Sequence, residues 1–256
     1  MFPGRRIRRS WSPIRRLAVG LLVFAIQGCN GPNDTANSAS KPSGAPDLAY
    51  ERERMVKLQI ESRGIRDERV LAAMRKVPRH RFAPDLDPSR AYEDRPQPIG
   101  AAQTISQPYI VALMSELAQL RPPCKVLEVG TGSGYQAAVL AEIGCTVYSI
   151  EIVEWLADRA RKILQAEGYG DQVHSRVGDG YRGWPAEAPF DAVIVTAAVP
   201  RIPQPLLDQL RLGGRLVIPV GDVRQALEVH HRTDERFERE WISDVRFVPM
   251  IGEIRE

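Results

Sequence analysis

The chain has 256 residues, of which 43% are hydrophobic and 26% are charged, and a formal net charge of +3. This length and composition suit a folded globular domain and exclude a disordered or fibrous chain. Six arginines and no acidic residue occur in the first 28 residues, so the remainder carries a net charge of −3. Since phosphate binding needs a basic face, we expect no nucleic-acid partner.

Residues 1–28 have the pattern of an export signal. An arginine-rich stretch is followed by the apolar run 17–26, which is too short to span a bilayer, and then by Gly28 and Cys29. A small residue before the cysteine is typical of a lipoprotein, in which Cys29 would carry a lipid anchor, although Gln27 fits that site poorly. Residues 29–46 predict a flexible linker. We expect a periplasmic or envelope-anchored protein; the alternative is a cytoplasmic product that starts at Met55.

Two more cysteines, Cys124 and Cys145, each precede a predicted strand. Parallel strands would make them neighbours at the N-terminal edge of a sheet. They lack metal-ligand spacing, and we expect no metal. Because free cysteine is often buried, we interpret them as two buried thiols.

Residues 47–122 predict helices and a substrate loop. Asp47 can cap a helix that Gly64 ends, and further helices are expected over residues 67–76 and 108–120. The apolar positions of the first helix are Leu48, Met55, Leu58 and Ile60. Residues 82–107 are rich in proline and show no sustained period, which predicts a long ordered loop.

Strands and helices alternate in residues 123–223. The expected strands are 126–129, 146–150, 173–177, 192–196 and 215–219, and the expected helices are 135–143, 153–167 and 205–212, the last followed by a glycine turn at 213–214. This order predicts an α/β fold with a doubly wound, Rossmann-like sheet. In residues 224–256, strands at 226–231 and 244–249 predict an antiparallel hairpin that completes the sheet.

The strongest motif is VLEVGTGSGYQ, residues 126–136, in which a strand runs through a glycine turn into a helix. Gly130, Gly132 and Gly134 would let the backbone approach a ligand closely. The pattern is GxGxG rather than GxGxxG, and the carboxylate of Glu128 would repel a pyrophosphate but tolerate a sulfonium cofactor. A nicotinamide or flavin site and a purely structural turn are the alternatives.

Two acidic positions support a nucleoside ligand. Glu151 ends the next strand, where a carboxylate can accept hydrogen bonds from both ribose hydroxyls. Asp179 and Gly180 follow the third strand, where they can receive the adenine edge. Together with the glycine turn, they favour S-adenosyl-L-methionine as the cofactor.

The segment AYEDRPQPIGAAQTISQPYIVA, residues 91–112, resembles the substrate loop of protein-L-isoaspartate O-methyltransferases. The resemblance extends to residues 77–84, 190–221 and 245–252. It implies transfer of a methyl group from S-adenosyl-L-methionine to the free carboxylate of L-isoaspartyl residues in damaged proteins and peptides, which is protein repair. It implies Ser106 as the active-site serine. The cofactor contacts that it implies are Glu128, Gly130, Glu151, Asp179, Gly180 and Gln225. The implied substrate contacts are Thr104, Ile105, Thr196, Ala197, Ala198 and Val248.

The loop departs from the family pattern at Ala102, where glycine is usual. If this position has a positive φ, alanine costs on the order of 1 kcal/mol. Ser106 has an alternative role as the cap of the following helix. Alternative functions are methyl transfer to another acceptor, or an inactive, envelope-anchored binding protein. We expect a monomer.

Overall fold

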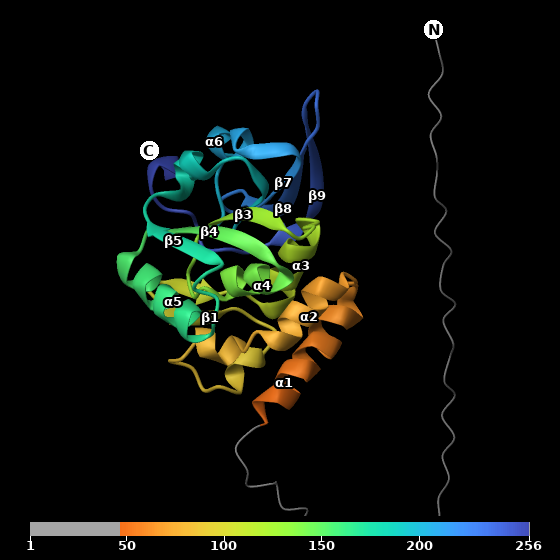
Figure 1. The fold of residues 1–256 in the computed structure, drawn as a ribbon, viewed down its shortest axis with the longest axis vertical. Coiled ribbons are helices and arrows are strands. Elements are labelled where there is room, and N and C mark those ends of the chain that lie inside the picture. The colour runs from red at the N-terminus through yellow and green to blue at the C-terminus, as the bar shows by residue number, and fades with distance from the viewer. Residues whose placement is uncertain (1–46, 256) are drawn as a thin grey trace, which may run out of the picture. The chain divides into compact units, whose positions relative to one another are not determined.

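The computed structural model describes residues 47–255, so the predicted export signal, the predicted lipid site at Cys29 and the predicted linker lie outside the described residues. A seven-stranded sheet with the order β5-β4-β3-β6-β7-β8-β9 forms the centre of this part (Figure 1). Strands β1 and β2 form a separate pair. The strands are β1 (Gln97–Gly100), β2 (Gln103–Ile105), β3 (Cys124–Val129), β4 (Cys145–Glu151), β5 (Val173–Val177), β6 (Phe190–Val195), β7 (Leu210–Val220), β8 (Gln225–Arg232) and β9 (Phe237–Val245).

Helices cover both faces of the large sheet (Figure 1). The α-helices are α1 (Leu48–Met55), α2 (Glu68–Lys76), α3 (Pro108–Leu117), α4 (Tyr135–Ile143), α5 (Glu154–Ala166) and α6 (Gln204–Asp208). Short helices are η1 (Val56–Ile60), η2 (Glu61–Arg63), η3 (Arg79–Phe82), η4 (Arg90–Tyr92), η5 (Gly180–Arg182), η6 (Pro185–Glu187) and η7 (Glu253–Arg255).

Alternate side chains of the strands enter two hydrophobic cores. Val126 packs with residues of α1 to α5 on one face, whereas its neighbour Leu127 packs with α6 on the other. Strands β3 to β7 pair in parallel, and β8 and β9 pair antiparallel. The predicted doubly wound α/β fold and its antiparallel C-terminal hairpin are confirmed.

The first helix changes its pitch after about two turns. Asp47 caps it by accepting hydrogen bonds from the backbone of the first turn, as predicted. The chain then continues as a π-helix, η1, and a 3-10 turn, η2, until Gly64. Because the wider π-turn shifts the inward face, Leu58 is 56% exposed and Val56 is buried in its place. The prediction that Leu58 faces the core is therefore wrong.

The proline-rich segment is not a simple loop, because β1 and β2 form an antiparallel hairpin within it. Ala101 and Ala102 make its two-residue turn, with φ of 50° and 55°. Positive φ at both central residues is the mark of a type I′ turn, which usually contains Asn-Gly. Two alanines give no such signal, which explains why the hairpin was missed.

Two boundaries near the C-terminus also differ from the prediction. Helix α6 ends at Asp208, and the residues that were expected to continue it begin strand β7. The glycines at 213–214 form a bulge in this strand rather than a turn. The last strand is β9, earlier than the predicted 244–249. It lies at the edge of the sheet, where charged side chains such as Glu238 and Glu240 can face solvent.

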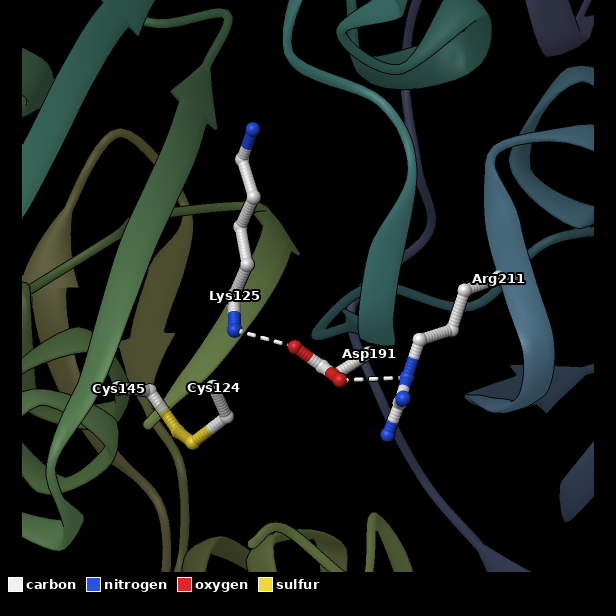
Figure 2. The surroundings of a disulfide bond; sticks show 5 residues. All are labelled: Cys124, Lys125, Cys145, Asp191 and Arg211. Carbon is white, nitrogen blue, oxygen red and sulfur yellow. Dashed lines mark hydrogen bonds and ion pairs between the residues drawn. A yellow bond between two sulfur atoms is a disulfide. The ribbon is translucent and has the colours of Figure 1, made fainter. Parts of the chain in front are cut away.

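Cys124 and Cys145 form a disulfide (Figure 2). The parallel register places them opposite one another on β3 and β4, with 4.5 Å between their Cα atoms, which is within disulfide range. The interpretation as thiols is wrong because the two sulfur atoms are bonded, whereas the expected burial and proximity of the two cysteines are confirmed. At the same edge, Asp191 accepts a hydrogen bond from the Lys125 backbone and pairs with Arg211, which links β3, β6 and β7.

Candidate active site

A cavity opens at the carboxyl ends of β3, β4 and β6. The strand order reverses at this place, because β4 and β5 are added on one side of β3 and β6 and β7 on the other. This switch point is where open α/β sheets bind ligands. The residues predicted from sequence that line it are Thr104, Ile105, Ser106, Gly130, Gly132, Glu151, Gly180, Thr196, Ala197 and Val248. The fold thus brings together ten positions from segments far apart in the chain.

Glu151 holds the glycine turn in place. Its Oε2 accepts a hydrogen bond of 2.7 Å from the Gly132 backbone, and its Oε1 accepts one of 3.0 Å from the Val153 backbone. Each carboxylate oxygen has a second lone pair. Glu151 can therefore still accept two ligand hydroxyl groups.

Gly130 is required by its contact with Thr196. A Cβ atom at Gly130 would lie 2.4 Å from Thr196 Oγ1, and φ is +97°. The Thr196 hydroxyl donates to the Gly130 carbonyl at 2.6 Å, which joins the ends of β3 and β6. Glycine at position 130 is therefore explained by the close packing of its backbone against Thr196, which follows the neighbouring strand β6.

Glu128 does not line the cavity. Its side chain is fully buried and hydrogen-bonded to Ser149, whose hydroxyl contacts Thr131 Oγ1 at 2.5 Å. Burial raises the pKa of Glu128 to about 8, and the charge of Glu151 adds to this rise. Because Glu128 is buried away from the cavity and burial disfavours its charged form, the sequence argument that used its charge against a pyrophosphate gains no support from the structure. The carboxylate in the cavity wall is Glu151.

Two other predicted cofactor contacts also lie outside the lining. Gly134 is the N-cap of α4, with its backbone against Leu164 and Ala160. Asp179 Oδ1 accepts from the Tyr181 backbone and Oδ2 from the Glu253 backbone, so its carboxylate holds the C-terminal segment.

Gln225 and Ala198 support the wall from behind. The Gln225 side chain makes two hydrogen bonds to the backbone of Phe247, next to Val248. The Ala198 backbone bonds with those of Val248 and Met250. These two residues thus position the segment that lines the cavity, without lining it themselves.

Sequence reasoning missed several lining residues. Thr131, Ser133 and Gln136 lie within the glycine motif, so the motif itself carried the signal for them. Met250 and Ile251 also line the cavity. They follow the last strand in an irregular segment, where no periodicity indicates which side chains turn inward.

A second hollow of about 770 Å³ adjoins the first, and it is lined by residues of η2, α3 and β9 among others. Thr104, Ser106, Thr196 and Val248 line both hollows. Ser106 therefore lies where a ligand in the first hollow would meet a ligand in the second.

Ser106 does not cap α3. The N-cap of α3 is Gln107, which makes no side-chain capping bond, and within residues 47–255 the Ser106 hydroxyl has no hydrogen-bond partner. The alternative role as a helix cap is therefore not supported. A half-buried hydroxyl at this junction is available to a ligand.

The hairpin of β1 and β2 lies against α5 beside the first hollow. A Cβ atom at Gly100 would lie 2.7 Å from the ring of Trp155, so the turn packs closely on this indole. The same hairpin carries Thr104 and Ile105 in β2, which line the first hollow together with Ile152 and Val153.

The first hollow fits S-adenosyl-L-methionine by its chemistry. Gly130 and Gly132 leave the backbone accessible, Glu151 offers acceptor oxygens for ribose, and Ile152, Met250 and Ile251 give apolar walls. Among residues 47–255, no cluster of three metal-binding side chains occurs, and no helix is both long and apolar enough to cross a membrane.

Comparison with known proteins agrees with this geometry. Curated relatives named protein-L-isoaspartate O-methyltransferase include one from Picosynechococcus sp., 57% identical over 201 residues, 78% of this chain and 90% of the relative. One from Gloeobacter violaceus is also 57% identical over 201 residues, 78% of this chain and 98% of the relative.

A solved protein-L-isoaspartate O-methyltransferase is 28% identical, with a TM-score of 0.73, and the match covers 79% of this chain and 67% of the other. A Plasmodium falciparum protein solved with S-adenosyl-L-homocysteine shares the fold at 24% identity and a TM-score of 0.69, over 78% of this chain and 98% of its own. The family model for protein-L-isoaspartate(D-aspartate) O-methyltransferase matches residues 50–255. The chain therefore belongs to the protein-L-isoaspartate(D-aspartate) O-methyltransferase family.

Proposed function

We propose that this protein transfers a methyl group from S-adenosyl-L-methionine to the free carboxylate of L-isoaspartyl residues in damaged proteins and peptides. The observation that carries the proposal is the position of Ser106, which lines both hollows. We assign the first hollow to the cofactor and call it the cofactor hollow, and we call the second hollow the groove. An acceptor that enters through the groove meets the Ser106 hydroxyl at the boundary of the two.

The chemistry requires little of the protein beyond orientation. A carboxylate with an ordinary pKa near roughly 4 is ionised at neutral pH and needs no general base. The bound cofactor supplies an electrophilic methyl group on a sulfonium. With the cofactor bound, the acceptor oxygen would form a bond to this carbon while the carbon–sulfur bond broke, the electron pair of that bond would stay on sulfur, and no proton would move. Ser106 orients the carboxylate, and the walls of the hollow exclude water.

The test is methyl transfer by the purified protein, with label in the methyl group of the cofactor. An isoaspartyl peptide is compared with its normal aspartyl twin, and we expect label in the first alone. Equal labelling of both peptides would contradict the acceptor assignment, while label in neither would contradict the activity.

We further propose that the protein acts outside the cytosol, as a monomer, with a lipid anchor at Cys29. The Cys124–Cys145 disulfide supports this location, since such bonds persist in oxidising compartments and are rare in the cytosol. The arginine-rich, apolar N-terminus supports it independently. This location requires that S-adenosyl-L-methionine reach the same compartment.

Fractionated cells test the location. Denatured extracts of each fraction are treated with a maleimide, which labels free thiols, either without reduction or after it. In the envelope fraction we expect Cys124 and Cys145 to be labelled only after reduction. Palmitate labelling of the wild type, lost in Cys29→Ala, would support the anchor. A cytosolic protein with both thiols free would contradict the proposed location, and light scattering checks the monomer.

A further inference from the structure

Arg79 is a fully buried cation without an acidic partner. It begins η3, its exposed fraction is 0%, and within the described part of the chain no carboxylate lies within ion-pair distance of its guanidinium. Burial lowers the pKa of Arg79 to about 10, so it remains charged at neutral pH. A buried charge is costly unless it is paired, so the place where the chain retains this one calls for an explanation.

The contacts of Arg79 lead to the junction of the two hollows. Its Nη2 donates to the Ser106 carbonyl and its Nε to the Ala91 carbonyl, both at 2.6 Å. Its guanidinium carbon lies 4.9 Å from the ring centroid of Tyr135, which lines the cofactor hollow. The remaining terminal nitrogen, Nη1, is buried without a partner among residues 47–255.

Hydrogen bonding to a carbonyl does not require a permanent charge. A neutral amide could hold the Ser106 carbonyl at a lower desolvation cost. The position of the charge is therefore informative. It lies directly behind the residue that faces the acceptor, at the N-terminal end of α3, whose dipole adds positive potential at the same place.

We propose that Arg79 is a positioning residue that fixes the Ser106 main chain and, through its buried charge, makes the groove select an acceptor carboxylate over a neutral group. This inference rests on the proposed function. The electrostatic interaction acts through protein, where screening by salt is weaker than in water.

The reaction gives this charge a second consequence. Methyl transfer converts an anion into a neutral ester, so the attraction to Arg79 is present with the substrate and absent with the product. The charge therefore favours substrate binding and product release more than it favours the transition state, in which the carboxylate has already lost part of its charge. Its loss should raise KM more than it lowers kcat.

The test compares two peptides that differ in one group: an isoaspartyl acid and its isoasparaginyl amide. Their dissociation constants are measured on the full chain saturated with S-adenosyl-L-homocysteine. We expect the wild type to prefer the acid, and Arg79→Met to reduce this preference on the order of tenfold. Arg79→Lys keeps the charge, so it should retain most of the preference while its kcat falls.

Arg81→Met is the matched control, because Arg81 lies in the same helix but is exposed and paired with Glu167. Its acid preference should equal that of the wild type. An unchanged preference in a folded Arg79→Met, or its loss in Arg79→Lys, would overturn the inference. If Arg79→Met does not fold, as thermal unfolding would report, Arg79→Gln takes its place, because its neutral amide can still donate to the Ser106 carbonyl. Failure of the wild type to methylate the acid would instead reject the proposed function.

Discussion

The Gly132 backbone donates a 2.7 Å hydrogen bond to Glu151 Oε2, and this bond ties the glycine turn after β3 to the end of β4. Glu151 is thus held in position from both sides, with Val153 bonded to its other oxygen. The predicted ribose acceptor is thus organised by the fold itself, and such preorganisation reduces the entropy lost on binding.

Replacing Glu151 with glutamine should weaken binding of S-adenosyl-L-homocysteine by about tenfold, because the amide keeps one acceptor oxygen and loses the charge. Titration calorimetry measures the dissociation constant. Glu154→Gln is the control, since this carboxylate is exposed in the first turn of α5. Equal affinity of wild type and Glu151→Gln would remove Glu151 from the cofactor site.

Ser106→Ala should leave binding of S-adenosyl-L-homocysteine unchanged and lower kcat by roughly 10- to 100-fold, because the acceptor carboxylate loses the group that orients it. Steady-state methylation of an isoaspartyl peptide provides the measurement. Ser243→Ala is matched, since Ser243 lines the groove but not the cofactor hollow. If both variants keep wild-type kinetics, the serine has no role in turnover.

The hairpin turn beside the cofactor hollow contains backbone strain that a single substitution can remove. Ala102 is exposed and has a φ of +55°, so the condition under which alanine was expected to be costly is met. Ala102→Gly should raise the free energy of unfolding by about 0.5 to 1 kcal/mol. Ala49→Gly, an exposed position in α1, should lower it by a similar amount. Urea denaturation compares them, and a destabilised Ala102→Gly would show that the turn has another conformation.

The sheet was predictable because its signals are local. Strand β5 and helix α4 have the predicted bounds, since apolar runs and flanking turn residues mark them directly. The hairpin and the bounds of β9 were not, because their sequences are proline-rich or charged and carry no strong strand signal. Strand pairing, rather than propensity, determines such elements.

The candidate site was also predictable only where its residues lie at positions that local sequence marks. Gly130, Gly132 and Glu151 were found from strand ends alone, because carboxyl ends of parallel strands converge. The distinction between Glu128 and Glu151 was not accessible, since both follow apolar strands and burial decides which of them faces the ligand. Arg79 gave no signal either, because arginine in a sequence usually predicts an exposed side chain.

Glu128 should make stability depend on pH in the direction opposite to that of a paired carboxylate. Its folded pKa of about 8 lies above the ordinary 4.5, so between these values the folded state keeps a proton that the unfolded state has lost. The free energy of unfolding should therefore fall as pH rises through this window, by about 1 kcal/mol per pH unit from this group. Glu128→Gln should flatten the profile measured by urea denaturation from pH 5 to 8, and Glu154→Gln should not. A profile as steep in Glu128→Gln as in the wild type would place the dependence elsewhere.

The disulfide should contribute to stability through the unfolded chain. Cys124 and Cys145 are 21 positions apart, and closing a loop of this size stabilises the folded state by about 3 kcal/mol in the chain-entropy description. Reduction should lower the free energy of unfolding of the wild type by about that amount. The double variant Cys124→Ala/Cys145→Ala should begin at the lower stability and not respond to reductant.

Because the bond lies at the N-terminal edge of β3 and β4, and the cofactor hollow at their carboxyl ends, binding of S-adenosyl-L-homocysteine to folded protein should be unchanged by reduction. A loss of binding on reduction, with the fold intact by circular dichroism, would instead show that the disulfide controls the site.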